Sequence, residues 1–127
     1  MKTVKSSFVY PVLWLIISTF LLVIPGKAFP KETWLDKIWL DKWVHIGMFA
    51  IMVFLWCRAT QGMNFEKRKL KTVFVFIALL WLAYGIGMEF VQKYLVSNRS
   101  FDTGDIIADA VGCLGGLMYS MKRYIKK

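Results

Sequence analysis

Ionisable residues recur at one depth in three apolar segments of this chain. His45, Glu89 and Asp109 each lie about one helical turn inside the end of an apolar stretch, and those three ends are expected to face the same side. A charged group in apolar surroundings is costly unless it is paired, so such groups mark a functional-site hypothesis. Imidazole and carboxylate side chains can exchange protons, bind cations or accept hydrogen bonds. The sequence therefore predicts one polar site shared by three helices.

Further polar residues are expected in the same layer, because they lie three or four residues from these three on a helical face or in the loop beside them. The predicted ligand-binding set is Asp41, Lys42, His45, Glu89, Gln92, Arg99, Asp102, Asp105 and Asp109. Arg99 is the expected partner of Glu89, with Lys42 second. Some members also have a simpler explanation: Asp105 suits a helix N-cap, and His45 alone would more often be a hydrogen-bonded structural residue.

Four apolar segments are expected to position these side chains. The hydrophobic fraction of 57% and the mean hydropathy of +0.51 are too high for an ordinary soluble domain. The predicted fold is an all-α membrane protein, a bundle of four transmembrane helices forming a single domain over residues 1–127. The predicted spans are residues 8–24, 43–59, 72–92 and 105–121.

Two boundaries allow alternatives. The first span could be a cleaved signal peptide, but its 17-residue apolar run and the three spans that follow favour an uncleaved helix. The second span is short for a bilayer. Residues 27–42 carry Trp34 and Trp39 on one helical face, which predicts either a short interfacial helix or an earlier start of the second span.

The distribution of basic residues predicts the orientation. Of the 17 Lys and Arg residues, 11 lie at the termini or in the 58–71 stretch. By the positive-inside rule, both termini should be cytoplasmic. The net charge of +9 does not indicate nucleic-acid binding, because the lysines lie between and beyond the apolar segments rather than on one soluble face.

Small residues and cysteines in the spans have structural interpretations. Ala108, Gly112 and Gly116 recur at spacings of four, which allows helix backbones to approach closely in a membrane. Cys57 and Cys113 have no second Cys or His at metal-ligand spacing and are expected to be buried, inert thiols.

The polar motifs resemble those of VanZ-like membrane proteins. The string Asp41-Lys42-Trp43-Val44-His45 is similar to that family's D-K-x-x-H signature. The stretch from Glu89 through Arg99 to Asp105 resembles its E-x-x-Q, Arg loop and D-x-x-D run before a Gly-rich last helix, although many members have Asn at the position of Asp109. The resemblance implies a multi-pass protein of the bacterial inner (cytoplasmic) membrane, in a family associated with glycopeptide resistance and teicoplanin.

The leading functional expectation is a non-enzymatic protein that binds an envelope lipid, or a peptidoglycan-precursor or glycopeptide-related ligand, in the outer leaflet. Lys42 and Arg99 would contact an anionic head group. The set holds three more acids than bases, which suits a cationic ligand, shared protons or a divalent cation bridging to phosphate. No metal site and no other cofactor is assigned.

Three alternatives stay open. The chain could be an intramembrane hydrolase or transferase acting on a lipid-linked substrate, with His45 and Glu89 as the candidate catalytic base and acid. The charges could instead form a buried ion-pair network that only holds four helices together. A transporter would require a dimer, and bundles this small are compatible with a homo-oligomer.

Overall fold

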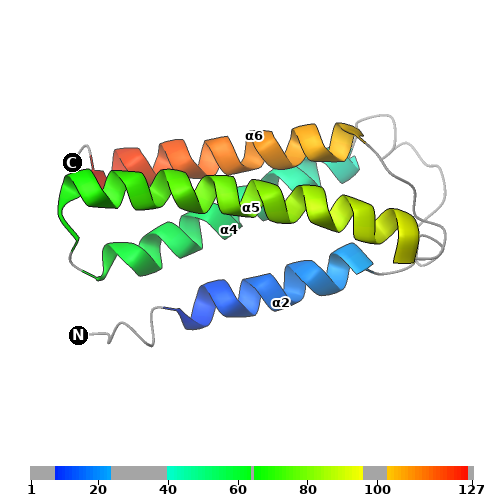
Figure 1. The fold of residues 1–127 in the computed structure, drawn as a ribbon, viewed down its shortest axis with the longest axis horizontal. Helices are drawn as coiled ribbons and strands as arrows, with labels where there is room; N and C mark the ends of the chain where they lie inside the picture. Colours follow the sequence, from blue (N-terminus) through cyan, green and yellow to red (C-terminus); the bar gives the residue numbers. More distant parts are fainter. Residues whose placement is uncertain (1–7, 24–39, 64, 96–102, 126–127) are drawn as a thin grey trace.

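The computed structural model describes residues 8–23, 40–63, 65–95 and 103–125 (Figure 1). These residues form four α-helices and no strand: α2 (Val9–Val23), α4 (Leu40–Gln61), α5 (Lys67–Leu95) and α6 (Thr103–Ser120). A π-helical turn, Met121–Ile125, continues α6. The expectation of four helices and an all-helical fold is therefore confirmed for the described residues.

The helix boundaries follow local sequence signals. Pro11 lies in the first turn of α2, where its missing N–H leaves no hydrogen bond unmade, and α2 ends two residues before Pro25-Gly26. Gly62 lies in the turn after α4. The Leu70 amide donates to the Glu66 carbonyl over 2.8 Å, which closes the first turn of α5.

Two predicted spans are longer in the structure, and for the first of them the alternative of an earlier start is confirmed. The helix expected over 43–59 begins at Leu40 and ends at Gln61, and its 22 residues are long enough to cross a bilayer. The helix expected over 72–92 runs from Lys67 to Leu95, because the basic residues at its start continue the helix instead of forming a loop. Most of the alternative interfacial helix over 27–42 lies outside the described residues.

The helices alternate in direction, so equivalent ends meet. Figure 1 shows the start of α2, the end of α4, the start of α5 and the end of α6 at one end of the bundle. As a consequence α4 and α6 run parallel, and they form the most extensive helix pair. The start of α2 and the end of α6 therefore lie at the same end of the bundle, as an even number of helices requires.

The core lies between α4, α5 and α6. Its fully buried side chains include Phe49, Met52 and Val53 of α4 and Phe74 of α5. Cys57 and Cys113 are both buried and free, as the sequence predicted.

Helix α2 is attached to the other helices by polar contacts. The Trp14 indole donates to the Met48 carbonyl over 3.0 Å, and the hydroxyls of Thr19 and Tyr84 share a hydrogen bond of 2.5 Å. These contacts fix the position of a helix that leaves most of its apolar face exposed.

Candidate functional site

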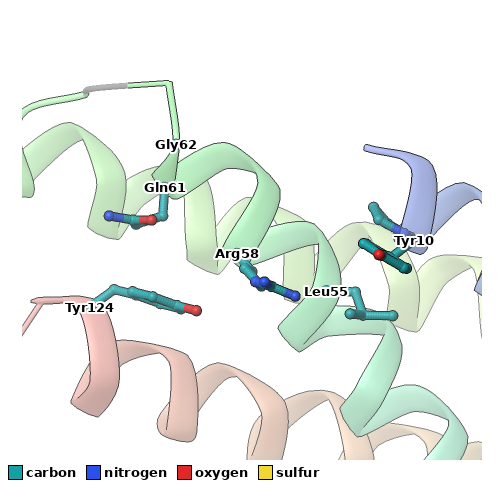
Figure 2. A pocket seen from close by; sticks show the side chains of 7 residues that line it. Tyr10, Leu55, Arg58, Gln61, Gly62 and Tyr124 are labelled. Atoms are coloured by element: carbon teal, nitrogen blue, oxygen red, sulfur yellow. The ribbon is translucent and has the colours of Figure 1, made fainter. Parts of the chain in front are cut away.

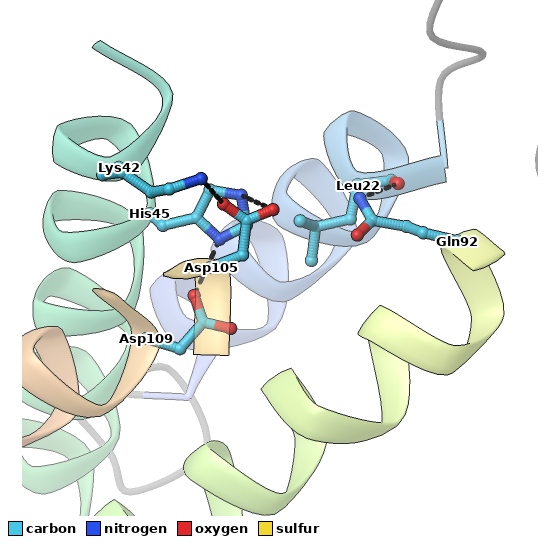
Figure 3. Close-up of polar contacts among 6 residues, drawn as sticks. All are labelled: Leu22, Lys42, His45, Gln92, Asp105 and Asp109. Carbon is cyan, nitrogen blue, oxygen red and sulfur yellow. Dashed lines mark hydrogen bonds and ion pairs between the residues drawn. The ribbon is translucent and has the colours of Figure 1, made fainter. Parts of the chain in front are cut away.

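A cluster of charged side chains lies at the end of the bundle where α4 and α6 begin. Figure 3 shows four of these side chains, which come from the first two turns of the two parallel helices. We call Lys42, His45, Asp105 and Asp109 the polar cluster. Lys42 and His45 are three residues apart on α4, and Asp105 and Asp109 are four apart on α6, so each pair lies on one face of its helix. These two faces are turned toward each other.

Two short contacts join the helices. Lys42 Nζ donates to Asp105 Oδ1 over 2.7 Å, and His45 Nδ1 lies 2.7 Å from Asp109 Oδ1. The second imidazole nitrogen, Nε2, lies 3.8 Å from Asp105 Oδ2. Asp105 therefore contacts both Lys42 and His45, and the imidazole lies between two carboxylates (Figure 3).

Burial increases with depth in the cluster. The Lys42 side chain is 22% exposed and the Asp105 side chain 12%, whereas Asp109 is only 2% exposed. The outer ion pair can therefore be reached from outside the bundle, whereas the inner His45–Asp109 pair is closed off. A ligand would meet Lys42 and Asp105 first.

The geometry favours a protonated His45. A neutral imidazole has one donor and one acceptor nitrogen, and its acceptor would face a carboxylate here. An imidazolium donates from both nitrogens and suits Asp105 and Asp109 together. The N-termini of α4 and α6 both lie at this end, and their partial positive charges also stabilise the carboxylates.

Glu89 adds a third carboxylate beside the cluster. Its side chain, from the last third of α5, is 1% exposed. Gly85, one turn earlier, allows α5 to approach: a Cβ there would lie 2.6 Å from Asp109 Oδ2. Phe49 would also be too close to that Cβ, at 3.1 Å.

Gln92 makes a contact that the sequence did not predict. Its side-chain amide donates to the Leu22 carbonyl over 2.7 Å, as Figure 3 shows. Leu22 lies in the last turn of α2, where carbonyls have no partner within the helix. Gln92 thus gives a carbonyl at the end of α2 a hydrogen-bond donor and links α2 to α5. The sequence carried no signal for this pairing across 70 residues.

The remaining predicted members are less fully described. Asp41 lies in the first turn of α4, but its side chain lies outside the described part of the structure. Arg99 and Asp102, including the expected Glu89–Arg99 pairing, lie outside the described residues. Within the described ranges, no group of three His, Cys, Asp or Glu side chains is arranged to hold a metal ion.

The comparisons with known proteins give one informative similarity. Over 118 residues the chain is 30% identical to a protein of the fission yeast Schizosaccharomyces pombe that is described as uncharacterized. The match covers 89% of this chain and 63% of the relative, so the chain spans less than two thirds of that protein's length. No protein-family model matches the chain. No solved structure matches it.

These findings overturn the resemblance to VanZ-like proteins. No family model supports it, and the relative is eukaryotic, so a bacterial membrane and a link to antibiotic resistance are unsupported. The motifs that suggested it are short, and charged residues at membrane-helix ends are common to many unrelated proteins. Of the described charged residues in those motifs, Lys42, His45 and Asp105 contact one another or Asp109.

Proposed function

We propose that this chain is a membrane protein with four spans that binds the polar headgroup of a membrane lipid at the polar cluster. The observation that supports it most is the outer Lys42–Asp105 ion pair, which offers both signs of charge at the edge of an otherwise apolar bundle. The peptidoglycan-related ligand depended on the overturned family resemblance and is not proposed.

The outer surface of the helices supports a membrane environment. Two stretches, Lys42–Gln61 and Lys67–Leu95, are long and apolar enough to cross a bilayer, and α2 is a shorter apolar helix. The outward residues are large and hydrophobic: Phe20 is 65% exposed, Phe76 63% and Ile107 64%. Monomeric soluble proteins rarely expose apolar surface so extensively. Lipid chains would cover it.

The cluster suits a headgroup that carries both a phosphate and an amine. Lys42 can donate to the phosphate, and the carboxylate of Asp105 can accept from the amine. Exchange of one internal ion pair for two intermolecular ones leaves no buried charge unpaired, which is the condition for such a site to be favourable. With Glu89, the carboxylates beside the cluster outnumber its basic groups, which favours binding of the amine over binding of a phosphate that carries no amine.

The test is lipid binding measured by native mass spectrometry of the purified protein in nanodiscs that contain phosphatidylethanolamine. We expect Lys42→Gln to weaken the binding of this lipid about tenfold or more, because a charge-assisted hydrogen bond contributes about 1.5–3 kcal/mol. Asp105→Asn should have a similar effect. Lys67→Gln, which removes an exposed charge at the other end of the bundle, is the control.

A folding defect must be separated from lost binding. The double variant Lys42→Gln/Asp105→Asn keeps a hydrogen-bonded pair without charge, so it should fold like the natural protein and still bind weakly. Equal affinity for phosphatidylethanolamine in the natural protein and all three variants would exclude a headgroup site at the polar cluster.

A second candidate function is acid–base catalysis on a lipid substrate. The buried His45–Asp109 contact of 2.7 Å favours it, because a carboxylate on one imidazole nitrogen orients the ring for proton transfer through the other. Against it, the other nitrogen faces Asp105 rather than open space.

Incubation of the protein with phospholipid vesicles distinguishes the two functions. An acid–base enzyme would produce a change in lipid mass that His45→Ala abolishes and Lys67→Gln preserves. A binding protein would leave the lipid masses unchanged.

A further inference from the structure

A cleft opens at the end of the bundle opposite the polar cluster. It has a volume of about 270 Å³ and lies between the start of α2, the end of α4 and the π-helical turn. Its lining residues are Tyr10, Pro11, Leu55, Arg58, Gln61, Gly62 and Tyr124. Arg58 and His45 are 13 residues apart on α4, which separates the cleft from the polar cluster by about 20 Å.

Arg58 is the charged group of this cleft. Figure 2 shows its guanidinium between Tyr10 and Tyr124, with the Tyr124 hydroxyl directed toward it and Gln61 one turn further along α4. Within the described ranges, no carboxylate forms an ion pair with Arg58, and none of the lining residues is acidic. An arginine is always charged and presents a planar set of donors. The cleft therefore offers a positive group that needs an acceptor.

The surroundings raise the positive potential further. Arg123 lies beside Tyr124, with its guanidinium carbon 5.7 Å from the ring centroid. The nearby start of α5 contributes Lys67, Arg68 and Lys69, all exposed, against a single described acid, Glu66. Concentrated charge of one sign attracts anions and raises their local concentration.

We propose that the Arg58 cleft binds a phosphate group, supplied by the headgroup of an anionic membrane lipid. The guanidinium would hold two phosphate oxygens by parallel hydrogen bonds. The Gln61 amide and the Tyr124 hydroxyl offer further donors, and Leu55 and Pro11 give the cleft an apolar wall.

The choice of a lipid rests on the membrane placement proposed above, whereas the phosphate chemistry does not. In that placement the cleft lies at the basic end of the bundle, where the positive-inside rule puts the cytoplasmic surface and its anionic lipids. The exposed apolar side chains of α2, such as Leu13 and Ile16, follow Tyr10 and Pro11 on the same helix and would contact the acyl chains. A soluble phosphate compound would have no such contact.

The test measures the affinity for phosphatidylglycerol of the natural protein and of its variants, by native mass spectrometry in phosphatidylcholine nanodiscs. Arg58→Gln should weaken binding about tenfold or more, and Arg58→Lys by less, because an ammonium lacks the two-pronged geometry. Tyr124→Phe, which removes one hydroxyl, should weaken it a few-fold. Lys93→Gln removes an exposed charge in the last turn of α5, at the opposite end of the bundle, and should leave the affinity unchanged.

A second arm identifies the source of the phosphate. Inorganic phosphate is titrated against detergent-solubilised protein and its Arg58→Gln variant; no saturable, Arg58-dependent binding is the expected result, and such binding would overturn the lipid source. Equal phosphatidylglycerol affinity in the natural protein, Arg58→Gln and Tyr124→Phe would overturn the site itself. Because the two sites are distant, Lys42→Gln should bind phosphatidylglycerol normally even if the polar cluster binds no lipid.

Discussion

Replacement of Asp109 by alanine is expected to lower the free energy of unfolding by about 3–5 kcal/mol, because it leaves a buried histidine without its carboxylate partner. The Asp109 carboxylate is almost fully enclosed and contacts His45 Nδ1 at 2.7 Å. Loss of one member of a buried pair is far more costly than loss of both. The measurement is reversible unfolding by sodium dodecyl sulfate in mixed micelles.

Three variants make this prediction specific. Asp109→Asn keeps a hydrogen-bonding side chain of the same size and should be less destabilising than alanine. The double variant His45→Leu/Asp109→Leu removes both polar groups and should recover part of the lost stability. Glu66→Ala removes an exposed carboxylate and should change stability by less than about 0.5 kcal/mol. If Asp109→Ala matched Glu66→Ala, the contact would have no structural importance.

The sequence predicted the helices well because each is a long apolar run, and such runs leave few alternatives for a chain. It placed their ends poorly. The basic residues that begin α5 were left outside the span predicted over 72–92, although Lys and Arg are good helix formers. Helix ends depend on capping contacts and on neighbouring helices, and hydropathy contains neither kind of information.

Of the predicted site residues, Lys42 with His45 and Asp105 with Asp109 could each be assigned to one helical face from spacing alone, because residues three or four apart lie on the same face of a helix. The direction of packing was not available from the sequence. The Gln92 contact with the end of α2 depends on where α2 ends and on its tilt. The Arg58 cleft was also missed, since Tyr10 and Tyr124 stand far apart in the chain and only the fold brings them together.

The second large effect is expected at the glycines where α4 and α6 pack together. Ile46 and Ala50 of α4 present their backbone carbonyls directly to Gly112 and Gly116. A Cβ at Gly116 would lie 2.5 Å from the Ala50 oxygen, and a Cβ at Gly112 would collide in the same way with Ile46. Backbone atoms cannot rotate away as a flexible side chain does, so the helices must separate.

We therefore expect Gly112→Ala and Gly116→Ala each to destabilise the protein by about 1–3 kcal/mol, and the pair together by more. Separation of α4 from α6 would also lengthen the Lys42–Asp105 and His45–Asp109 contacts, because those pairs join the same two helices. Lipid binding at the polar cluster should then weaken in these variants, although neither glycine touches the cluster. Binding at the Arg58 cleft is measured in parallel as a second readout.

Gly115 supplies the matched control, since it is the neighbouring residue on the same helix and a Cβ there meets nothing within 4 Å. Gly115→Ala should be neutral or stabilising by up to about 1 kcal/mol, because alanine has the higher helix propensity. The difference in unfolding free energy between Gly115→Ala and Gly116→Ala separates the effect of close backbone packing from the effect of helix propensity. Equal unfolding free energies for the two variants would mean that α4 and α6 do not approach each other along this face, and the polar cluster would then lose the scaffold that assembles it.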